Sequence, residues 1–435
     1  MGQHHAGVTP YIRLYTALPE ARMRPDLMRQ IDYYAGIPLC FCITLLYRLQ
    51  RLLGCKNPRY EENPTRVLFI ELAEMGSTVL AYPAMHALKT RYPDVQLYFV
   101  MFKHLKESLE LYDLIPKEHL FCIDSTSLWS LLRDTIKFAM ACRKASIDTA
   151  IVLEMFARYS TVLSYVSGAR KRVGFYRYHQ EGLYIGNFLS HKVHYNPHIH
   201  TAHAFLSLVY ALEASGGQVP LTKVSLDSLE EHTLDLPIFQ TSAADRAQLW
   251  HLLQAGRAAL DPRKKLVIVN PNASAWLSIR KWPLNNYAAL VKRLLTDTEL
   301  YVVITGVVAE KPDADYICQA VQDERVLNLA GKTTLTNLLH LFNLGSVLIT
   351  NDSGPAHFAA LTTIHTMVFF GPETPKLYRP LGKNCTVLYT NYACSPCVSA
   401  YNQRRSPCQD NVCLQSISVD EVYGMVRALL EPRQV

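Results

Sequence analysis

The sequence predicts an α/β protein of two Rossmann-like domains, each built on a parallel sheet, that face each other across a cleft. The chain has 435 residues, and a length of roughly 150 residues per domain points to two or three domains. Short apolar runs alternate with stretches of helical spacing, which is typical of a parallel sheet covered by helices on both faces. This alternation of strand and helix patterns stops near residue 215 and starts again near residue 262, which indicates two halves.

The first half is expected to form a domain over residues 63–235. Residues 66–70 (RVLFI) are a short apolar run that predicts a strand, and a loop with Gly76 and a helix over about 79–92 follow it. The further strands expected in this half are 95–102 and 148–153.

The second half is expected to form a domain over residues 236–435. Its strands are expected at 265–270, 300–305, 326–329, 346–350 and 366–370, and its helices at 284–295 and 334–343. Ligands of such sheets bind beyond the carboxyl ends of the strands. The loops that follow these strands are therefore the places where functional residues are expected.

Residues 1–62 are expected to hold an N-terminal tail and a membrane-associating helix. Residues 35–47 are almost wholly apolar, and Arg48 and Arg51 follow them. A helix of these 13 residues is about 20 Å long, less than the ~30 Å hydrocarbon core, and Pro38 would interrupt a spanning helix. We therefore expect a helix in the membrane interface, with its arginines at anionic headgroups. A helix packed on the protein's own core is the alternative.

The charge and the cysteines narrow the expected partners and compartment. The formal net charge is +7 and the pI is about 8.7, without the large basic block of a nucleic-acid-binding protein. We expect an anionic small molecule or a lipid headgroup, and no nucleic acid. The first 30 residues hold no continuous apolar core, so no cleavable signal is expected. Eleven unevenly spaced cysteines fit reduced thiols in the cytoplasm.

Residues 350–357 (TNDSGPAH) carry the strongest functional signal. They follow a predicted strand and lead into a helix of small residues, and Asp352 and Ser353 stand where a helix N-cap is expected. Gly354 allows a ligand to approach the backbone, and exposed N–H groups with the helix dipole favour a phosphate. An ordinary capped helix is the alternative interpretation of this segment alone.

Other polar loops follow neighbouring strands. Asn272 lies in the segment NPNA (270–273) and Lys281 in RKWP (280–283), where a lysine can meet a phosphate as a point charge. Gly306 ends a further strand, and the Glu310 carboxylate after it can hold a ribose hydroxyl. The remaining segments of this kind are FGPET (370–374) and RPLG (379–382).

The order of these motifs resembles glycosyltransferase family 9, the heptosyltransferase-like enzymes of lipopolysaccharide assembly. The N-terminal half agrees, because IELAEMGS (70–77) and YPAMHALK (82–89) resemble the first strand, glycine loop and helix of that family. The similarity covers about residues 65–430. The segments SGA (167–169) and KRVGF (171–175) also fit.

The resemblance implies a GT-B fold and an inverting mechanism that uses no catalytic metal. It also implies a nucleotide-sugar donor as substrate, bound mainly by the C-terminal domain. Carried over by motif, Lys281 should meet the donor phosphates and Glu310 should face the nucleoside. The other residues expected at the donor site are Asn272, Gly306, Asn351, Asp352, Ser353, Gly354 and His357.

The catalytic base is where this sequence departs from the family. The usual Asp after the loop glycine is Ser77 here, and a serine cannot remove a proton unaided. Glu74, in the same loop, and Glu154, after the strand DTAIVLE, are the two candidates. Glu154 is weighted slightly above Glu74 because a carboxylate at the end of a strand points into the cleft. Either one can instead be a salt-bridge partner of Arg158 or Arg170.

Residues 170–203 are rich in arginine, lysine and histidine. We expect a basic loop there that binds a lipid-linked or phosphorylated glycan acceptor, with a solvated surface loop as the alternative. No histidine pair has the spacing of a zinc hydrolase, so a metal is not favoured in this segment. The residues expected to bind the acceptor are Ser77, Arg158, Arg172 and Arg177.

Four cysteines crowd into residues 394–413. Two thiolates in a CxxC turn can share one ion, and two more complete a tetrahedron. We expect a knuckle that binds structural zinc or iron, with disulfides or free thiols as the alternative. The four expected ligands are Cys394, Cys397, Cys408 and Cys413.

The sequence therefore predicts an inverting glycosyltransferase at the inner membrane face, cytoplasmic and peripheral or monotopic. It would move a sugar, such as heptose from ADP-heptose, from a nucleotide donor to a lipopolysaccharide-core or other lipid-linked glycan. One alternative is a GT-B epimerase or hydrolase of nucleotide sugars. The other is a catalytically impaired membrane-bound scaffold of the same fold, which Ser77 suggests.

Overall fold

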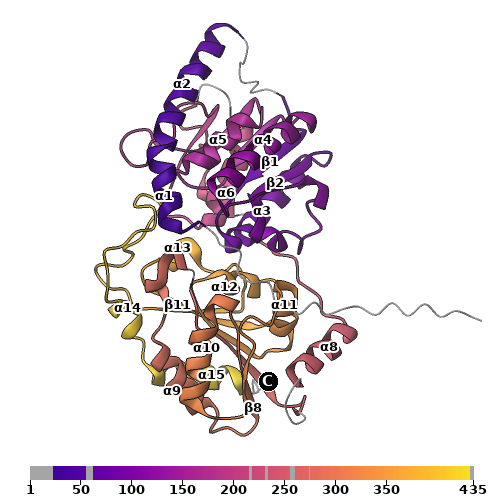
Figure 1. Ribbon diagram of the computed structural model, residues 1–435, viewed down its shortest axis with the longest axis vertical. Coiled ribbons are helices and arrows are strands. Elements are labelled where there is room, and N and C mark those ends of the chain that lie inside the picture. The colour runs from indigo at the N-terminus through magenta and orange to yellow at the C-terminus, as the bar shows by residue number, and fades with distance from the viewer. Residues whose placement is uncertain are drawn as a thin grey trace, which may run out of the picture.

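A computed structural model describes residues 23–54, 62–214, 218–230, 234–254, 260–273 and 275–431. Two α/β domains lie one above the other along the long axis of the molecule (Figure 1). Helix α7 (Leu226–Glu230) packs on the first domain and α8 (Ala243–Gln254) on the second, so the chain passes from one domain to the other between them. The expected tail over residues 1–22 lies outside the described residues.

The first domain contains a six-stranded parallel sheet of order β3-β2-β1-β4-β5-β6. Helices α3 (Met75–Arg91) and α6 (Thr201–Tyr210) pack together on one face, and α4 (Leu128–Lys144) and α5 (Arg158–Val166) on the other. Its strands are β1 (Arg66–Ile70), β2 (Gln96–Phe102), β3 (Leu120–Ile123), β4 (Thr149–Val152), β5 (Lys171–Tyr176) and β6 (His191–His194).

The second domain repeats this plan with a parallel sheet of order β12-β11-β10-β7-β8-β9. One face carries α9 (Leu284–Leu294), α10 (Lys311–Val321) and α15 (Val419–Leu430). The other carries α8, α11 (Leu335–Leu344) and α12 (Gly354–Ala359), while α13 (Pro375–Tyr378) and α14 (Val412–Gln415) are short. Its strands are β7 (Lys265–Asn270), β8 (Leu300–Ile304), β9 (Val326–Asn328), β10 (Val347–Asn351), β11 (His365–Phe370) and β12 (Cys385–Tyr389).

The predicted fold class is confirmed, because both sheets are parallel and are covered by helices. The strongest strand predictions hold because central parallel strands are buried on both faces; every residue of β8, for example, is buried. The expected basic loop over residues 170–203 is wrong in part, since β5 and β6 lie within it. Lys171, Arg172 and His191 are buried in these strands, so polar residues there do not mark a surface loop.

The N-terminal helices α1 (Pro25–Tyr34) and α2 (Gly36–Leu52) follow one another nearly in line, joined by Ala35, and lie against the first domain (Figure 1). The inner side of α2 is buried against α5 and a neighbouring loop. Pro38 does not break this helix because it lies in the first turn, where backbone N–H groups have no partner within the helix. Among the described residues, no helix is both long enough and apolar enough to cross a membrane.

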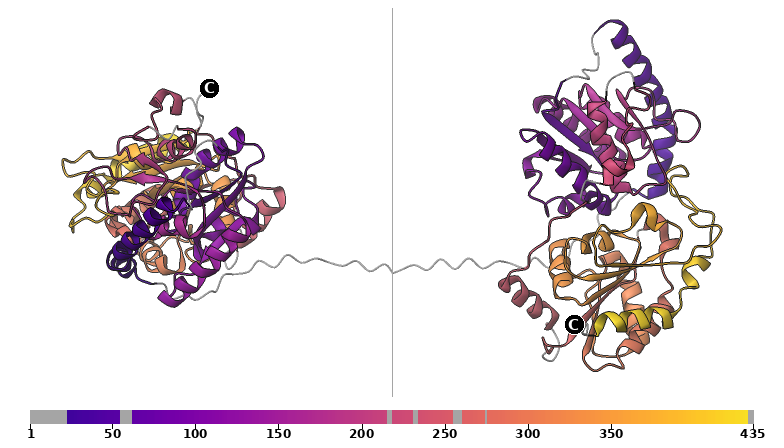
Figure 2. Two further views of the ribbon diagram at one scale, coloured as in Figure 1. Left: turned by 90° about the horizontal axis from the view of Figure 1, so that it is seen from above. Right: turned by 180° about the vertical axis from the view of Figure 1, so that it is seen from behind.

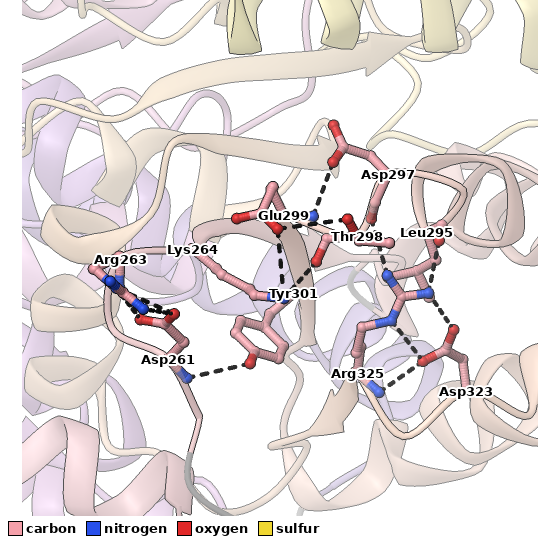
Figure 3. Close-up of polar contacts among 10 residues, drawn as sticks. All are labelled: Asp261, Arg263, Lys264, Leu295, Asp297, Thr298, Glu299, Tyr301, Asp323 and Arg325. Atoms are coloured by element: carbon pink, nitrogen blue, oxygen red, sulfur yellow. Dashed lines mark hydrogen bonds and ion pairs between the residues drawn. The ribbon is translucent and has the colours of Figure 1, made fainter.

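A polar network ties together the amino ends of strands β7, β8 and β9 (Figure 3). The Arg325 guanidinium donates to the carbonyls of Leu295 and Asp297 at 2.6 and 2.9 Å and pairs with the Asp323 carboxylate at 2.6 Å. Lys264 donates to the Thr298 carbonyl at 2.7 Å. The carboxyl ends of these strands face the first domain. The network lies at the opposite ends of the strands and fixes their positions there.

Candidate active site

The carboxyl ends of the two sheets face each other, and α3 contacts α12 across the domain boundary (Figure 1). The approach is closest at Gly76 in the first turn of α3. A Cβ added there would lie 2.7 Å from His357 Cδ2 and 3.5 Å from Gly354 Cα, closer to the histidine ring than a real side chain can come. The glycine loop of the first domain and the TNDSGPAH segment of the second therefore meet at one place.

Asn351 holds three loops of the second domain together. Its side-chain oxygen accepts from the Trp282 backbone N–H at 2.8 Å and from the Tyr287 hydroxyl at 3.2 Å. Its amide donates to the Asn272 carbonyl at 3.1 Å. Ser353 also turns inward, since its hydroxyl donates to the Asn351 carbonyl at 3.1 Å. Both predicted donor-site residues therefore use their side chains to shape the site.

Arg280 and Asp352 form a buried ion pair beside this turn, with Arg280 Nη1 3.2 Å from Asp352 Oδ2. Burial raises the pKa of Asp352, and the nearby Arg280 cation opposes that rise. Arg280 Nε is also buried and has no hydrogen-bond partner among the described residues. The cation next to TNDSGPAH is thus Arg280 rather than Lys281.

His357 and Glu373 are two further buried polar residues beside this turn, and with Arg280 and Asp352 they form the wall of the site. Burial lowers the pKa of His357 to about 3, so its imidazole is neutral at neutral pH. Burial also raises the pKa of Glu373 well above its usual value. His357 Nδ1 and both Glu373 carboxylate oxygens lack hydrogen-bond partners within the described part of the chain. Buried polar atoms are normally satisfied, so these atoms are candidates for contact with a ligand.

Asn272, Gly306 and Glu310 lie together at the end of β8. A Cβ on Gly306 would lie 2.9 Å from Asn272 Nδ2 and 3.1 Å from Glu310 Oε2. The Asn272 amide is buried, and neither of its polar atoms has a partner among the described residues. Lys281 Nζ is 2.7 Å from Asp313 Oδ2, and the Lys281 charge also acts on Glu310. This group forms a second polar subsite next to the Arg280 pair.

Glu154 fixes the position of the glycine loop, which follows β1, through hydrogen bonds. One of its oxygens accepts from the backbone N–H groups of Leu72 and Ala73, both at 3.1 Å, and the other accepts from the Ser160 hydroxyl. The side chain is half-buried, and the loss of solvation there raises its pKa. Both oxygens are therefore engaged in positioning the loop that follows β1.

Glu74 lies at the domain boundary as the N-cap residue of α3, with 42% of its side chain exposed. It forms an ion pair with Arg404 of the second domain, and the Ser77 hydroxyl donates to its Oε2 at 3.2 Å. Arg404 Nε is also 3.6 Å from Glu373 Oε1. Glu71, directly after β1, is buried nearby; burial and the Glu154 charge raise its pKa, while Arg404 opposes this.

Two residues expected to bind the acceptor are buried supports instead. Arg158 is 2% exposed, and its Nη1 donates to Asp32 Oδ2 of α1 at 2.8 Å. Arg172 is 1% exposed, donates to the Phe188 carbonyl at 2.8 Å and lies over the Tyr47 ring of α2. Their guanidinium groups hold α1 and α2 on the domain. Arg177 is different, because it lines an open pocket beside α2.

The structure gives no support to the expected zinc or iron knuckle. Cys394 is exposed, the Cys408 thiol donates to the Asp410 carbonyl at 3.1 Å, and the Ser406 hydroxyl donates to Cys397 Sγ at 3.3 Å. Cys413 is buried in the core of the second domain. Over the described part of the chain, no three histidine, cysteine or acidic side chains are grouped to hold a metal ion. Burial, and after it the nearby Cys397, Cys394 and Cys408, raise the pKa of the Cys413 thiol, so the four cysteines lie in one region of the fold. The zinc or iron knuckle stays a prediction.

Sequence reasoning missed four residues of this site: Glu71, Arg280, Glu373 and Arg404. Arg280 and Glu373 lie inside the motifs RKWP (280–283) and FGPET (370–374), and this position was the one sequence signal for them. Arg404 gave no local signal, because only the path of the loop after β12 brings it to the first domain.

The comparisons with known proteins agree with this geometry. Residues 135–406 match the profile of Glycosyltransferase family 9 (heptosyltransferase). The chain is 23% identical over 372 residues to lipooligosaccharide heptosyltransferase 2 of Campylobacter jejuni subsp. jejuni serotype O:2, which covers 84% of this chain and 98% of that protein.

Two solved structures share the fold. The Escherichia coli ADP-heptose lipopolysaccharide heptosyltransferase II superimposes with a TM-score of 0.66 at 18% identity, covering 84% of this chain and 98% of that one. A family 9 glycosyltransferase from Veillonella parvula DSM 2008 gives 0.64 at 17% identity, covering 86% and 99%. Because the family profile spans more than half of the sequence and the two-domain fold agrees with it, the chain belongs to glycosyltransferase family 9 and is a glycosyltransferase.

Proposed function

We propose that the protein transfers heptose from ADP-heptose to a lipopolysaccharide-core or similar lipid-linked glycan at the inner face of the membrane. The transfer inverts the anomeric centre and uses no catalytic metal, as the family resemblance implies. The names of the similar proteins support the sugar and the donor, since they are heptosyltransferases and one is described as acting with ADP-heptose.

One observation carries the proposal: several buried polar atoms of the second domain have no hydrogen-bond partner within the described residues, and they lie where the glycine loop of the first domain meets it. Burying a polar group without a hydrogen bond costs about 1–3 kcal/mol. A site that holds several such groups is stabilised by a ligand that satisfies them. The atoms are Asn272 Oδ1 and Nδ2, Arg280 Nε, His357 Nδ1 and the two Glu373 oxygens.

The donor diphosphate is assigned to Arg280 and His357, beside the TNDSGPAH turn. Arg280 provides fixed positive charge for the negative charge that grows on the departing diphosphate, and neutral His357 provides a hydrogen bond without a further charge. Asn272 and Glu310 are assigned to the nucleoside, with Gly306 leaving room between them. Lys281, 31% exposed beside Glu310, stays in the proposed site at the edge of the phosphates.

Glu74 is the proposed base. In the transfer its carboxylate takes the proton from the acceptor hydroxyl as that oxygen bonds to the anomeric carbon. The bond from that carbon to the diphosphate oxygen breaks on the opposite face, and the nucleoside diphosphate leaves. Glu74 is favoured over Glu154 because it lies at the domain boundary with 42% of its side chain exposed, where an acceptor can reach it. The Glu154 oxygens accept from the backbone of the loop and from Ser160 within the first domain. The Ser77 hydroxyl orients the Glu74 carboxylate.

The test is turnover by the purified full-length chain. ADP-heptose is incubated with a heptose-deficient lipopolysaccharide-core acceptor, and the product is followed by mass spectrometry and by the NMR coupling at the new anomeric centre. The proposal expects one added heptose of inverted configuration. Release of free heptose without acceptor indicates a hydrolase, and epimerised donor indicates an epimerase. A chain that binds no nucleotide sugar is a scaffold, and the proposal is then wrong.

A further inference from the structure

A face of the first domain, outside the active site, exposes large apolar side chains on two helices. On α2 and its C-cap, Leu45, Leu49 and Leu52 are 50, 53 and 85% exposed. Soluble proteins rarely leave such contiguous apolar surface uncovered. The full apolar face of α2 consists of Leu39, Phe41, Leu45, Leu46, Leu49, Leu52 and Leu53.

A second apolar row lies on α4. Helices α2, α5 and α4 lie side by side on the same face of the first sheet, as Figure 1 and the view from above in Figure 2 show. Trp129 is 76% exposed, and tryptophan is the residue enriched where protein meets the headgroup region of a membrane. The spacing of the row is helical, and its members are Leu128, Trp129, Leu132, Ile136 and Met140.

Basic side chains gather along one flank of α2. Arg48 lines a pocket of about 410 Å³ together with Arg177 and the ring of Tyr184. It also lines a neighbouring pocket of about 310 Å³ with Arg51 and Lys192. The sequence of α2 contains no acid, and the acid on the facing segment, Glu181, accepts from the backbone N–H groups of Tyr178 and His179.

The charges of this flank act on one another. Lys192 is half-buried, and its pKa is lowered by burial and then by Arg51 and Arg48. Such mutual repulsion is relieved when an anion lies between the cations. Phosphate oxygens suit this site because guanidinium groups bind them in pairs and the tyrosine rings can cover the headgroup.

We propose that the apolar faces of α2 and α4 insert into the acyl boundary of an acidic phospholipid bilayer, with the lipid phosphate bound at Arg48 between Arg177 and Lys192. Apolar area together with cations at its edge is the combination that binds amphipathic helices to anionic membranes. The α1 end of this pair of helices lies next to the loop that carries Arg404, since Arg29 feels the charge of Arg405, and α2 runs from there to the far end of the first domain (Figure 1). The proposal rests on the proposed function in that a lipid-linked acceptor lies in the same membrane.

The experiment is vesicle flotation of the full-length chain. Vesicles of phosphatidylethanolamine with phosphatidylglycerol are compared with vesicles of phosphatidylcholine alone. We expect binding to the acidic vesicles, weakened by salt, and Leu45→Asp with Leu49→Asp to abolish it. Arg48→Gln should weaken it about five-fold, the effect of losing one surface cation. The matched controls are Ile238→Asp and Arg246→Gln on exposed positions of the second domain, which should bind as the unmodified chain does.

Two measurements distinguish a failure of the membrane proposal from a failure of the proposed transferase function. Turnover of ADP-heptose on a deacylated, water-soluble acceptor should be unchanged in the Leu45 and Leu49 double variant, and its thermal unfolding shows that it folds. Equal binding to neutral and acidic vesicles, or flotation of the double variant, would overturn the membrane proposal. So would a dimer in light scattering that this variant converts to a monomer, because a second copy then covers the apolar face.

Discussion

Glu74 of the first domain and Arg404 of the second form an ion pair across the domain boundary. Arg404 also lies 3.6 Å from Glu373, so one cation connects the loop that carries the proposed base with the wall of the donor site. The two domains are therefore linked at the point where acceptor and donor must meet. We therefore expect loss of either partner to lower the rate of the reaction and not only the stability of one domain.

The first prediction separates the two candidate bases. Glu74→Gln should lower kcat by about 10²–10⁴-fold, the usual contribution of a general base, while leaving donor binding nearly unchanged. Glu154→Gln should instead lower the free energy of unfolding, because its amide cannot accept on both sides from the loop and from Ser160. Steady-state rates and thermal unfolding of the two variants decide between them. A larger loss of kcat in Glu154→Gln, with unchanged stability, would show that Glu154 is the base.

The second prediction concerns the leaving group. Arg280→Ala should lower kcat/KM for the donor by about 10²-fold or more, as removal of a donor to developing negative charge does. Arg280→Lys should restore part of this loss. Arg263→Ala is the matched control, because Arg263 is exposed in the network at the far edge of the sheet (Figure 3). Initial rates at varied ADP-heptose test this, and equal rates in both alanine variants would contradict it.

The third prediction uses the buried histidine. His357 has an ordinary pKa near 6.5 in the unfolded chain and about 3 in the folded one, so the unfolded state binds a proton first as the pH falls. Stability from this group is present at neutral pH and lost as the pH falls below 6.5. In His357→Gln, the fall in unfolding free energy between pH 7 and pH 5 should be smaller by about 2 kcal/mol. Urea unfolding at the two pH values measures it, and an unchanged pH dependence would contradict the buried neutral state.

The fourth prediction tests the close approach of the domains. Gly76→Ala places a methyl group 2.7 Å from the His357 ring, so the glycine loop must shift away from the donor site. Activity should fall at least ten-fold through the displaced Glu74, since small misplacements of catalytic groups are costly. Gly424→Ala in α15 is the control: its Cβ has no heavy atom within 4 Å, and it should stabilise the helix by about 0.5–1 kcal/mol without changing the rate.

The fifth prediction tests the corrected role of Arg158. Asp32→Ala leaves the buried Arg158 guanidinium without its carboxylate and should lower the unfolding free energy by about 3 kcal/mol. Paired removal, Asp32→Ala with Arg158→Met, should recover part of this loss. KM for the acceptor should stay constant in both. A rise in acceptor KM without loss of stability would return Arg158 to the acceptor site.

Most of the fold could be predicted from the sequence, because central parallel strands are short uninterrupted apolar runs. Strand β1 over Arg66–Ile70 and strand β7 over Lys265–Asn270 were predicted with these bounds. Strand β5 and the edge strand β6 were not, since lysine, arginine and histidine interrupt their apolar pattern. Lys171, Arg172 and His191 are buried through contacts that come from other elements, and such contacts leave no mark in the local sequence.

The segments that meet at the candidate site could also be predicted, but the contacts of individual residues within them could not. Asn351 and Ser353 carry the right chemistry for a ligand and yet bond to the protein's own backbone. Glu154 ends a strand, as the sequence indicated, but its oxygens are taken by a neighbouring loop. The partner of a polar group depends on which loops the fold brings together, and this is long-range information.

The most direct test of the central claim is a crystal structure of the chain with ADP. We expect the diphosphate between the domains, within hydrogen-bond distance of Arg280 and His357, and the adenosine beside Asn272 and Glu310. A diphosphate bound elsewhere, with Arg280 still paired only to Asp352, would contradict it.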